Sequence, residues 1–340
     1  MTKISIIGAG SWGIALASLL YHQGNKITVW SAVGSEINAL NTTRRLPTLP
    51  DLKLPESMFF TEDLEQAMKD SDMLIMAVPS IYVRQTAEKM RPFCKKGQIL
   101  VNVAKGIEDI TLMTLSAVIE QELPMADVAV LSGPSHAEEV SRGLPTTCVV
   151  GARSRQTAEW IQERFMSPVF RVYTSPDILG IEIGGALKNV IALAAGIADG
   201  LGYGDNTKAA LITRGIYEIT RLGLIMGGKT STFGGLSGIG DLIVTCASMH
   251  SRNRRAGILI GKGYSMKEAM DEVQMVVEGV YSAKAGLALA KRYQVPVPII
   301  TEVNQVLFEG KSARSAVNDL MLRDRTEESA EVEWETNISQ

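Results

Sequence analysis

Near its N-terminus the chain passes from a short apolar run directly into a glycine-rich turn, and this feature constrains the fold more than any other. The run Lys3–Ile7 is typical of a buried strand, and the glycine-rich segment 8–13 (GAGSWG) follows it and opens a helix. Gly8 permits a tight turn, Gly10 lets the backbone approach a pyrophosphate, and Gly13 lets the helix pack closely on the strand. The free N–H groups of such a helix start favour phosphate. We therefore interpret the loop as a dinucleotide site, the alternative being a chance cluster of glycines.

Up to residue 177, short apolar runs alternate with helical patterns. The predicted strands are rich in Val and Ile: Lys3–Ile7, Lys26–Trp30, Met73–Val78, Ile99–Val103, Val128–Leu131, Thr146–Val150 and Val169–Tyr173. Predicted helices separate many of them: Ser11–Tyr21, Leu64–Lys69, Tyr82–Met90 and Thr111–Glu122. Strands that are apolar at nearly every position are typical of a parallel sheet covered on both faces. The pattern predicts an α/β fold with an N-terminal Rossmann-like, doubly wound, mostly parallel sheet.

From residue 178 onward, strand-like runs are rare. Helical patterns replace them at Ile178–Gly200, Asn206–Gly223, Met266–Val273, Tyr281–Tyr293 and Ile299–Glu309. A length of 340 residues fits two domains. We predict a dinucleotide-binding domain over residues 1–177, an all-α substrate and catalytic domain over 178–325, and a disordered acidic tail over 326–340.

Charge and composition argue against several classes of function. The chain has 34 Lys+Arg against 37 Asp+Glu, and this balance disfavours binding to nucleic acid or anionic membranes through bulk charge. Its three cysteines, Cys94, Cys148 and Cys246, fit neither a disulfide framework nor a metal motif, as in a cytoplasmic protein. We expect no metal site. No uncharged apolar run reaches 18 residues, so we expect no transmembrane helix and no stable membrane insertion.

The end of the second predicted strand leaves the choice between NAD and NADP open. NAD sites of this fold carry Asp or Glu near this point, where it binds the ribose. Here Ser31-Ala32 offers neither an acid nor a base, and Glu36 is the nearest carboxylate. Arg44 and Arg45 follow and could reach a 2′-phosphate.

Polar groups follow other strands, at the edge where open α/β sheets bind their ligands. Lys105 comes after one strand and is expected to point into the crevice, unless it is a solvated surface lysine. After another strand, Gly133 offers a backbone N–H and Ser135 a hydroxyl. We expect the neighbouring His136 to be a hydrogen-bonded residue rather than a base, because a helix N-terminus disfavours its cation.

A lysine interrupts the most apolar predicted helix, Ile178–Gly200. Burial of Lys188 lowers its pKa because the charged form is desolvated, and a second cation such as Lys105 lowers it further. An amine tuned in this way can exchange a proton near neutral pH. The alternative is a lysine that reaches to solvent at the edge of the domain.

Two further segments suggest a phosphate pocket. Asp241 follows a glycine-dense stretch where a helix begins, so it is either a site residue or a helix N-cap. The segment 251–255 (SRNRR) places a hydroxyl, a guanidinium and an amide at the start of another helix. Arg binds phosphate through two hydrogen bonds, and the helix start adds N–H donors. We expect Ser251, Arg252 and Asn253 to bind the anion, and Arg254 or Arg255 to lie on the surface.

Together these segments resemble a known family. The motifs GAGSWG, NVAKG, LSGPSHAEEV, GGALKNVIALAAGIADG, GLSGIGDLIVTC, SRNRRAG and VVEGV occur in the order found in bacterial-type NAD(P)-dependent sn-glycerol-3-phosphate dehydrogenases, and they span Lys3 to about Leu320. The resemblance implies reversible reduction of dihydroxyacetone phosphate to glycerol 3-phosphate with NADH or NADPH. It further implies a cytoplasmic enzyme whose product is a precursor for phospholipid synthesis. We also expect a homodimer.

The resemblance also implies roles for individual residues. Lys188 would be the proton acceptor, and Lys105 would contact both substrate and cofactor. The expected substrate site also contains Gly133, Ser135, Asp241, Ser251, Arg252 and Asn253. The expected cofactor site contains Gly8, Gly10, Ser11, Trp12, Gly13, Arg45, Lys105, Ala137, Arg252, Val276 and Glu278. Ser31-Ala32 and Arg45 depart from the family pattern at the adenosine end of the cofactor.

Three other interpretations remain open at this stage. A related two-domain β-hydroxyacid dehydrogenase would share the fold, although a Ser-Arg-Asn cluster suits a phosphate better than a carboxylate. A non-enzymatic dinucleotide sensor would need neither the buried lysine nor the anion pocket. A structural or partner-binding protein would explain neither the glycine loop nor the lysine.

Overall fold

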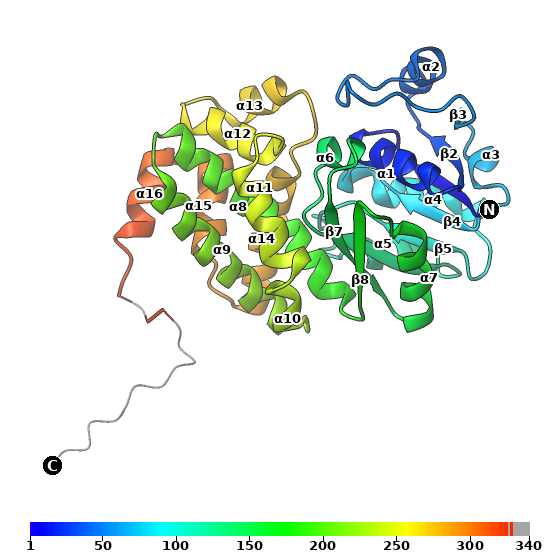
Figure 1. Ribbon diagram of the computed structural model, residues 1–340. Helices are drawn as coiled ribbons and strands as arrows, with labels where there is room; N and C mark the ends of the chain where they lie inside the picture. The colour runs from blue at the N-terminus through cyan, green and yellow to red at the C-terminus, as the bar shows by residue number, and fades with distance from the viewer. Residues whose placement is uncertain (326, 329–340) are drawn as a thin grey trace.

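The strands of the first half form one eight-stranded sheet in the computed structural model, which describes residues 1–325, 327 and 328 (Figure 1). The order is β3-β2-β1-β4-β5-β6-β7-β8. The strands are β1 (Lys3–Ile7), β2 (Lys26–Trp30), β3 (Phe59–Thr61), β4 (Met73–Met76), β5 (Ile99–Asn102), β6 (Asp127–Ser132), β7 (Thr146–Ala152) and β8 (Phe170–Ser175). All neighbours are parallel except β6 and β7, which pair antiparallel. The predicted doubly wound, mostly parallel sheet is confirmed.

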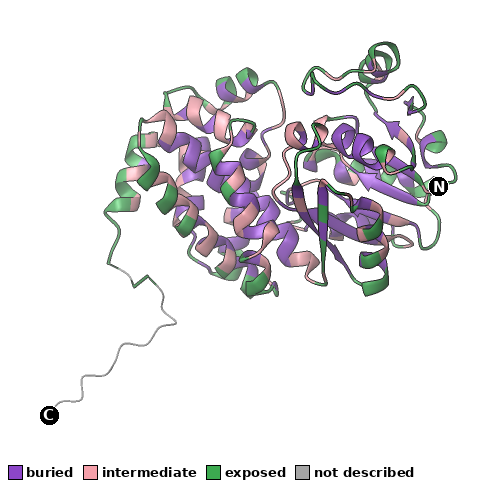
Figure 2. Ribbon diagram, viewed as in Figure 1, coloured by how far each residue is buried: buried purple, intermediate pink, exposed green. Residues whose placement is uncertain are grey.

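Helices cover both faces of this sheet, and each face has its own apolar cluster. One cluster contains residues of α1 (Ser11–His22), α2 (Gly34–Thr43), α6 (Ala137–Ser141) and α7 (Arg155–Phe165). The other contains residues of α3 (Leu64–Met68), α4 (Val83–Met90) and α5 (Leu115–Glu122). The central strand β4 is buried at all four positions, as expected for a strand covered on both sides (Figure 2).

The sequence-based prediction missed β3 and misplaced several strand ends by one or two residues. β3 has only three residues and lies at the sheet edge, where Phe59 is 44% exposed, so it lacks the long apolar run that marks the inner strands. The predicted strands Met73–Val78 and Ile99–Val103 are too long, because the chain turns away into the polar loops at the carboxyl edge.

The second half is helical and is built around one long buried helix, α8 (Ile178–Gly200). The other helices are α9 (Asp205–Ile225), α10 (Thr230–Phe233), α11 (Asp241–Ala247), α12 (Arg252–Gly261), α13 (Met266–Val273), α14 (Glu278–Tyr293), α15 (Pro298–Phe308) and α16 (Ala313–Met321). A single π-helical turn, Leu236–Gly240, precedes α11. α8 is long and apolar enough to cross a membrane, but 89% of its most apolar window is buried inside the structure. An all-round apolar surface suits such a core helix.

The predicted helices of this half are confirmed as elements, and Ile178–Gly200 and Met266–Val273 have the predicted bounds. α14 begins three residues earlier than predicted, because Glu278 occupies its first turn. α16 was not predicted; it is short, and only Ala316 of its nine residues is buried. The domain limits, 1–177 and 178–325, stay a prediction. The predicted tail, 326–340, lies outside the described residues except for residues 327 and 328.

Candidate active site

A cleft of about 830 Å³ lies between the carboxyl edge of the sheet and the helical half. Residues of both halves line it, and they include Ser11 and Lys105 from the sheet half and Lys188 and Arg252 from the helical half. Open α/β sheets bind ligands at this edge. The fold therefore brings together most of the residues that the sequence singled out.

The glycine loop has the shape expected for a phosphate cradle. Gly8 adopts φ +124°, and a Cβ there would lie 2.7 Å from the backbone of Ala77. A Cβ on Gly13 would lie 2.3 Å from the carbonyl oxygen of Gly8, so only glycine lets α1 begin this close to the strand. A Cβ on Gly10 would meet nothing within 4 Å, so the loop faces open space. No side chain caps α1, which leaves its first N–H groups free for an anion. The loop fits the pyrophosphate of a dinucleotide.

A buried cluster of two lysines and one aspartate forms the floor of the cleft. Lys188, which is 6% exposed, donates hydrogen bonds to Asp241 and, at 2.7 Å, to the hydroxyl of Thr245. Lys105 Nζ donates to the other carboxylate oxygen of Asp241 at 2.6 Å and to the carbonyl oxygen of Gly133 at 3.1 Å. One carboxylate thus holds two ammonium groups that come from different halves of the chain.

Local sequence explains how these groups can meet. The small residues of α8 let the sheet edge approach closely, since a Cβ on Gly185 would lie 3.1 Å from Ser132 Oγ and in ordinary contact with the Lys105 side chain. Asp241 is the first residue of α11, and Thr245 follows one helical turn later on the same face. Gly240 precedes the helix as its N-cap residue, and the Asp241 side chain binds the lysines, so the N-cap alternative for Asp241 is wrong.

The environment of this cluster changes the proton affinity of its members. Burial lowers the pKa of Lys188 to about 7; the negative charge of Asp241 opposes this shift and the positive charge of Lys105 adds to it. Burial raises the pKa of Asp241, but the charges of Lys105 and Lys188 outweigh burial and hold it below its usual value. The cluster therefore combines an ionised carboxylate with an amine that can gain or lose a proton near neutral pH.

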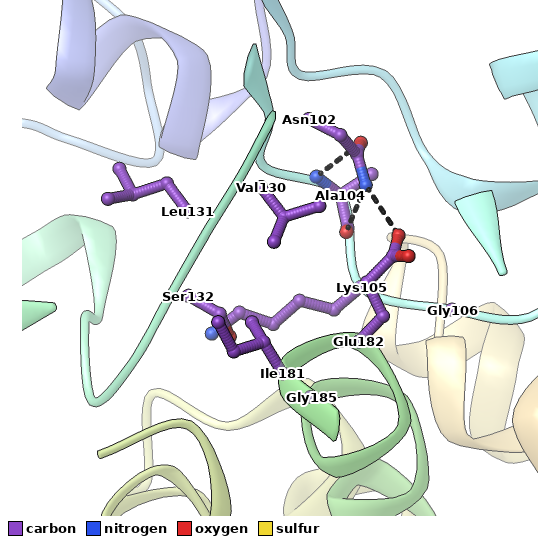
Figure 3. A pocket seen from close by; sticks show the side chains of 10 residues that line it. All are labelled: Asn102, Ala104, Lys105, Gly106, Val130, Leu131, Ser132, Ile181, Glu182 and Gly185. Carbon is purple, nitrogen blue, oxygen red and sulfur yellow. Dashed lines mark hydrogen bonds between the residues drawn. The ribbon is translucent and has the colours of Figure 1, made fainter. Parts of the chain in front are cut away.

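A second buried carboxylate, Glu182, supports the loop that carries Lys105 and was not identified from the sequence. Figure 3 shows Asn102, Lys105 and Glu182 around a small pocket beside α8. Glu182 accepts hydrogen bonds from Asn102 Nδ2 at 3.3 Å and from the backbone N–H and hydroxyl of Ser116. Asn102 also accepts a hydrogen bond from the backbone N–H of Ala104 at 3.1 Å. The only sequence signal was an acid in an otherwise apolar turn of α8.

The start of α12 carries the residues that were expected to bind an anion. Ser251 is the N-cap residue and accepts a hydrogen bond from the N–H of Arg254 at 3.2 Å. Asn253 donates to Asn189 Oδ1 at 2.9 Å and accepts from the N–H of Gly279 at 2.8 Å, so it joins α12 to α8 and α14. Ser251, Arg252 and Asn253 all line the cleft, and burial lowers the pKa of Arg252.

The prediction that Arg254 or Arg255 lies on the surface is wrong. Arg254 forms an ion pair with Asp199 at 2.8 Å, and its side chain is 13% exposed. Arg255 is partly buried and lines the cleft. The helical register of α12 explains both positions, because successive residues of a helix face different neighbours.

Of the remaining predicted site residues, most line the cleft, whereas Gly133 and Arg45 do not. Ser135, Ala137, Val276 and Glu278 line the cleft together with Ser11 and Trp12. Glu278 accepts a hydrogen bond from the N–H of Ser80 at 3.0 Å, and burial raises the pKa of its carboxyl group.

The cofactor contact of Arg45 stays a prediction: its side chain is exposed, its guanidinium donates to the carbonyl oxygen of Pro50 at 3.1 Å, and it does not line the cleft. His136 has a lowered pKa, mainly through burial. It hydrogen-bonds the backbone of Val244, but its Nε2 has no partner.

Across residues 1–325, 327 and 328, no group of three or more His, Cys, Asp or Glu side chains could hold a metal ion.

Comparison with known proteins agrees with this geometry. Residues 3–158 match the N-terminal family "NAD-dependent glycerol-3-phosphate dehydrogenase N-terminus", and residues 177–318 match the corresponding C-terminal family. A glycerol-3-phosphate dehydrogenase [NAD(P)+] of Agathobacter rectalis is 63% identical over 98% of this chain and 100% of its own length. One of Bacillus subtilis is 51% identical over 96% of both chains.

Solved structures give the same result for the fold. The crystal structure of glycerol-3-phosphate dehydrogenase from Coxiella burnetii has a TM-score of 0.90 and 36% identity, and it covers 95% of this chain and 99% of its own. The matches confirm the resemblance seen in the motifs and select it over the interpretations as a sensor or a structural protein. The chain therefore belongs to the NAD-dependent glycerol-3-phosphate dehydrogenase family and is an oxidoreductase that uses NAD or NADP.

Proposed function

We propose that the chain catalyses the reversible reduction of dihydroxyacetone phosphate to sn-glycerol 3-phosphate, with Lys188 as the group that exchanges the proton. One observation carries this proposal. Lys188 is buried beside a dinucleotide-shaped cleft, with a pKa of about 7 and a carboxylate that orients it. A group that must both accept and donate a proton works best when its pKa lies near the working pH.

The residues of the cluster divide the chemistry between them. In the oxidation direction, neutral Lys188 takes the proton of the C2 hydroxyl; in the reduction direction, protonated Lys188 returns it to the ketone oxygen. The bound nicotinamide supplies or accepts the hydride at C2. Lys105 stabilises negative charge that develops on the same oxygen. Asp241 holds the nitrogens of both lysines in place, through contacts with one oxygen each.

The start of α12 binds the phosphate in this proposal. Ser251, Arg252 and Asn253 lie on the cleft wall at the first turn of a ten-residue helix. The guanidinium and the helix N-terminus both attract an anion. Binding energy from the phosphate would position C2 over Lys188. An anion site of this kind also favours a phosphorylated substrate over a β-hydroxyacid.

We assign the wider site as follows. The substrate residues are Lys105, Gly133, Ser135, Lys188, Asp241, Ser251, Arg252 and Asn253. The cofactor residues are Gly8, Gly10, Ser11, Trp12, Gly13, Lys105, Ala137, Arg252, Val276 and Glu278. Supporting this division, the first set surrounds the lysine cluster and the start of α12, and the second runs along the glycine loop and the facing wall of the cleft.

Three expectations extend the proposal beyond the reaction. We propose that the product supplies glycerophospholipid synthesis and that the enzyme works in the cytoplasm without stable membrane insertion. Three unpaired cysteines and the burial of α8 support this location. We also propose a homodimer, which light scattering of the purified protein would test directly by its mass.

The test of the proposed function is Lys188→Ala, compared with Lys208→Ala as a matched control. Lys208 lies in the same half of the chain and pairs with Asp199 at 2.9 Å, and it does not line the cleft. We expect Lys188→Ala to lose nearly all oxidation of NADH or NADPH with dihydroxyacetone phosphate and to retain dinucleotide binding, measured by protein fluorescence. Lys208→Ala should retain turnover. Substantial turnover by Lys188→Ala would contradict the assignment.

A further inference from the structure

We propose that Glu36 selects NAD(H) over NADP(H) by placing a carboxylate where a 2′-phosphate would have to lie. This inference deepens the proposed function and rests on its placement of the dinucleotide. It concerns the end of the cleft formed by the loop after β2, far along the chain from the lysine cluster. Trp30, Ser31, Ala32, Val33 and Glu36 line the cleft there.

The carboxylate of Glu36 is held in a defined position. The Ser31 hydroxyl donates a hydrogen bond to Glu36 Oε2 at 2.6 Å, and the N–H of Val33 donates to the Ser31 oxygen at 3.1 Å. Glu36 belongs to the first turn of α2, directly after β2. The acid therefore stands near the carboxyl end of β2, where carboxylates of this fold accept a hydrogen bond from the ribose 2′-hydroxyl. The sequence spacing had left this open, because Glu36 lies several residues beyond the strand.

A second carboxylate reinforces the negative charge at the same helix start. A Cβ built on Gly34, the first residue of α2, would lie 2.7 Å from Glu62 Oε2. The N–H groups at the start of a helix would otherwise attract a phosphate. With Glu36 in the cleft and Glu62 against Gly34, an additional dianion at this point would meet like charge on two sides.

The two arginines that follow α2 make other contacts and do not line the cleft. Arg44 Nη1 donates to the carbonyl oxygen of Met58 at 2.8 Å, and its guanidinium lies 5.0 Å from the centroid of the Phe60 ring. Arg45 donates to Pro50, and neither arginine lines the cleft.

Among the described residues that line the cleft, the basic side chains are Lys89, Lys105, Lys188, Arg252, Arg255, His136 and His250. None of these belongs to the loop after β2 or to α2, and Lys89 lies on α4, which follows β4. Strand β1 separates β4 from β2 in the sheet. The loop after β2 and the start of α2 thus provide acceptors for a ribose hydroxyl and no cation for a phosphate.

The experiment measures binding, independent of turnover. Dissociation constants for NADH, NADPH, 5′-ADP and 2′,5′-ADP are determined by calorimetry on the full-length protein and on two variants. Glu36→Gln keeps the size and an acceptor oxygen but removes the charge. Glu88→Gln is the matched control, because Glu88 is exposed on α4 and does not line the cleft.

We expect the unsubstituted protein to bind NADH at least roughly tenfold more tightly than NADPH, and 5′-ADP more tightly than 2′,5′-ADP. Glu36→Gln should reduce both ratios toward one mainly by strengthening the 2′-phosphorylated ligands, and Glu88→Gln should leave the ratios unchanged. Equal binding of NADH and NADPH by the unsubstituted protein, or a ratio that Glu36→Gln does not change, would overturn the inference and leave the proposed function intact. Failure of both dinucleotides to bind would overturn both.

Discussion

The buried amine of Lys188 should make the protein less stable than it would be with an apolar residue at this position, to a degree that depends on pH. Lys188→Met is the informative substitution, since Met has a similar length, fills the same space and carries no charge. Asp241 keeps its hydrogen bond from Lys105 in the variant, so the carboxylate is not left unpaired.

The size and sign of this pH dependence follow from the pKa of Lys188. Burial lowers it from 10.5 to about 7. Between these values the unfolded chain holds a proton that the folded protein lacks, so the free energy of unfolding rises with pH in this window. The full difference corresponds to roughly 5 kcal/mol. Between about pH 6 and about pH 9, the free energy of unfolding of the wild type should rise by about 2–3 kcal/mol of this total.

The assay is urea unfolding of the wild type and of Lys188→Met at several pH values between about 6 and 9. The difference in unfolding free energy between the two proteins cancels the titration of groups that they share. We expect the variant to be the more stable protein at the acid end, with an advantage that shrinks by about 2–3 kcal/mol toward the alkaline end. Lys291→Met, at an exposed position on α14, is the matched control and should show no such trend.

A difference between wild type and Lys188→Met that stays constant across this pH range would refute the reasoning. It would mean that Lys188 keeps its proton in the folded protein throughout, so that the amine could not act as a base near neutral pH. The pH profile of kcat/KM for glycerol 3-phosphate oxidation gives an independent reading, because activity should fall as pH drops through about 7.

Three other predictions concern the phosphate wall, the support of the Lys105 loop and the packing of α8. Arg252→Ala should raise the KM for dihydroxyacetone phosphate roughly ten- to hundredfold in steady-state assays, since it removes charge-assisted hydrogen bonds; an unchanged KM would argue against the phosphate assignment. Glu182→Ala should lower kcat roughly tenfold or more by loosening the loop of Lys105, and Glu182→Gln, which retains an acceptor, should recover most of it; equal loss in both variants would count against a positioning role. Gly196→Ala should destabilise the protein by about 3 kcal/mol in urea unfolding, because its Cβ would lie 2.2 Å from the backbone oxygen of Arg254. Gly234→Ala, whose Cβ would lie 3.7 Å from its nearest neighbour, is the control, and a similar loss in both would contradict the packing argument.

The sequence by itself determined the features that depend on neighbouring residues. Apolar runs predicted the inner strands, and the full length of α8 followed from its composition. The spacing of Gly8, Gly10 and Gly13 after a strand predicted the cradle, because turn geometry is a local property of the backbone. Lys188 stood out for a similar reason, since a charge inside an apolar helix needs a specific partner.

Only the tertiary structure decided which distant groups meet. Asp241 lies 53 positions from Lys188 and 136 positions from Lys105, and nothing in local periodicity pairs them. The role of Glu182 likewise depends on packing between separate elements. Periodicity and propensity describe which face of an element is buried, whereas the pairing of polar side chains depends on how the buried elements pack against one another.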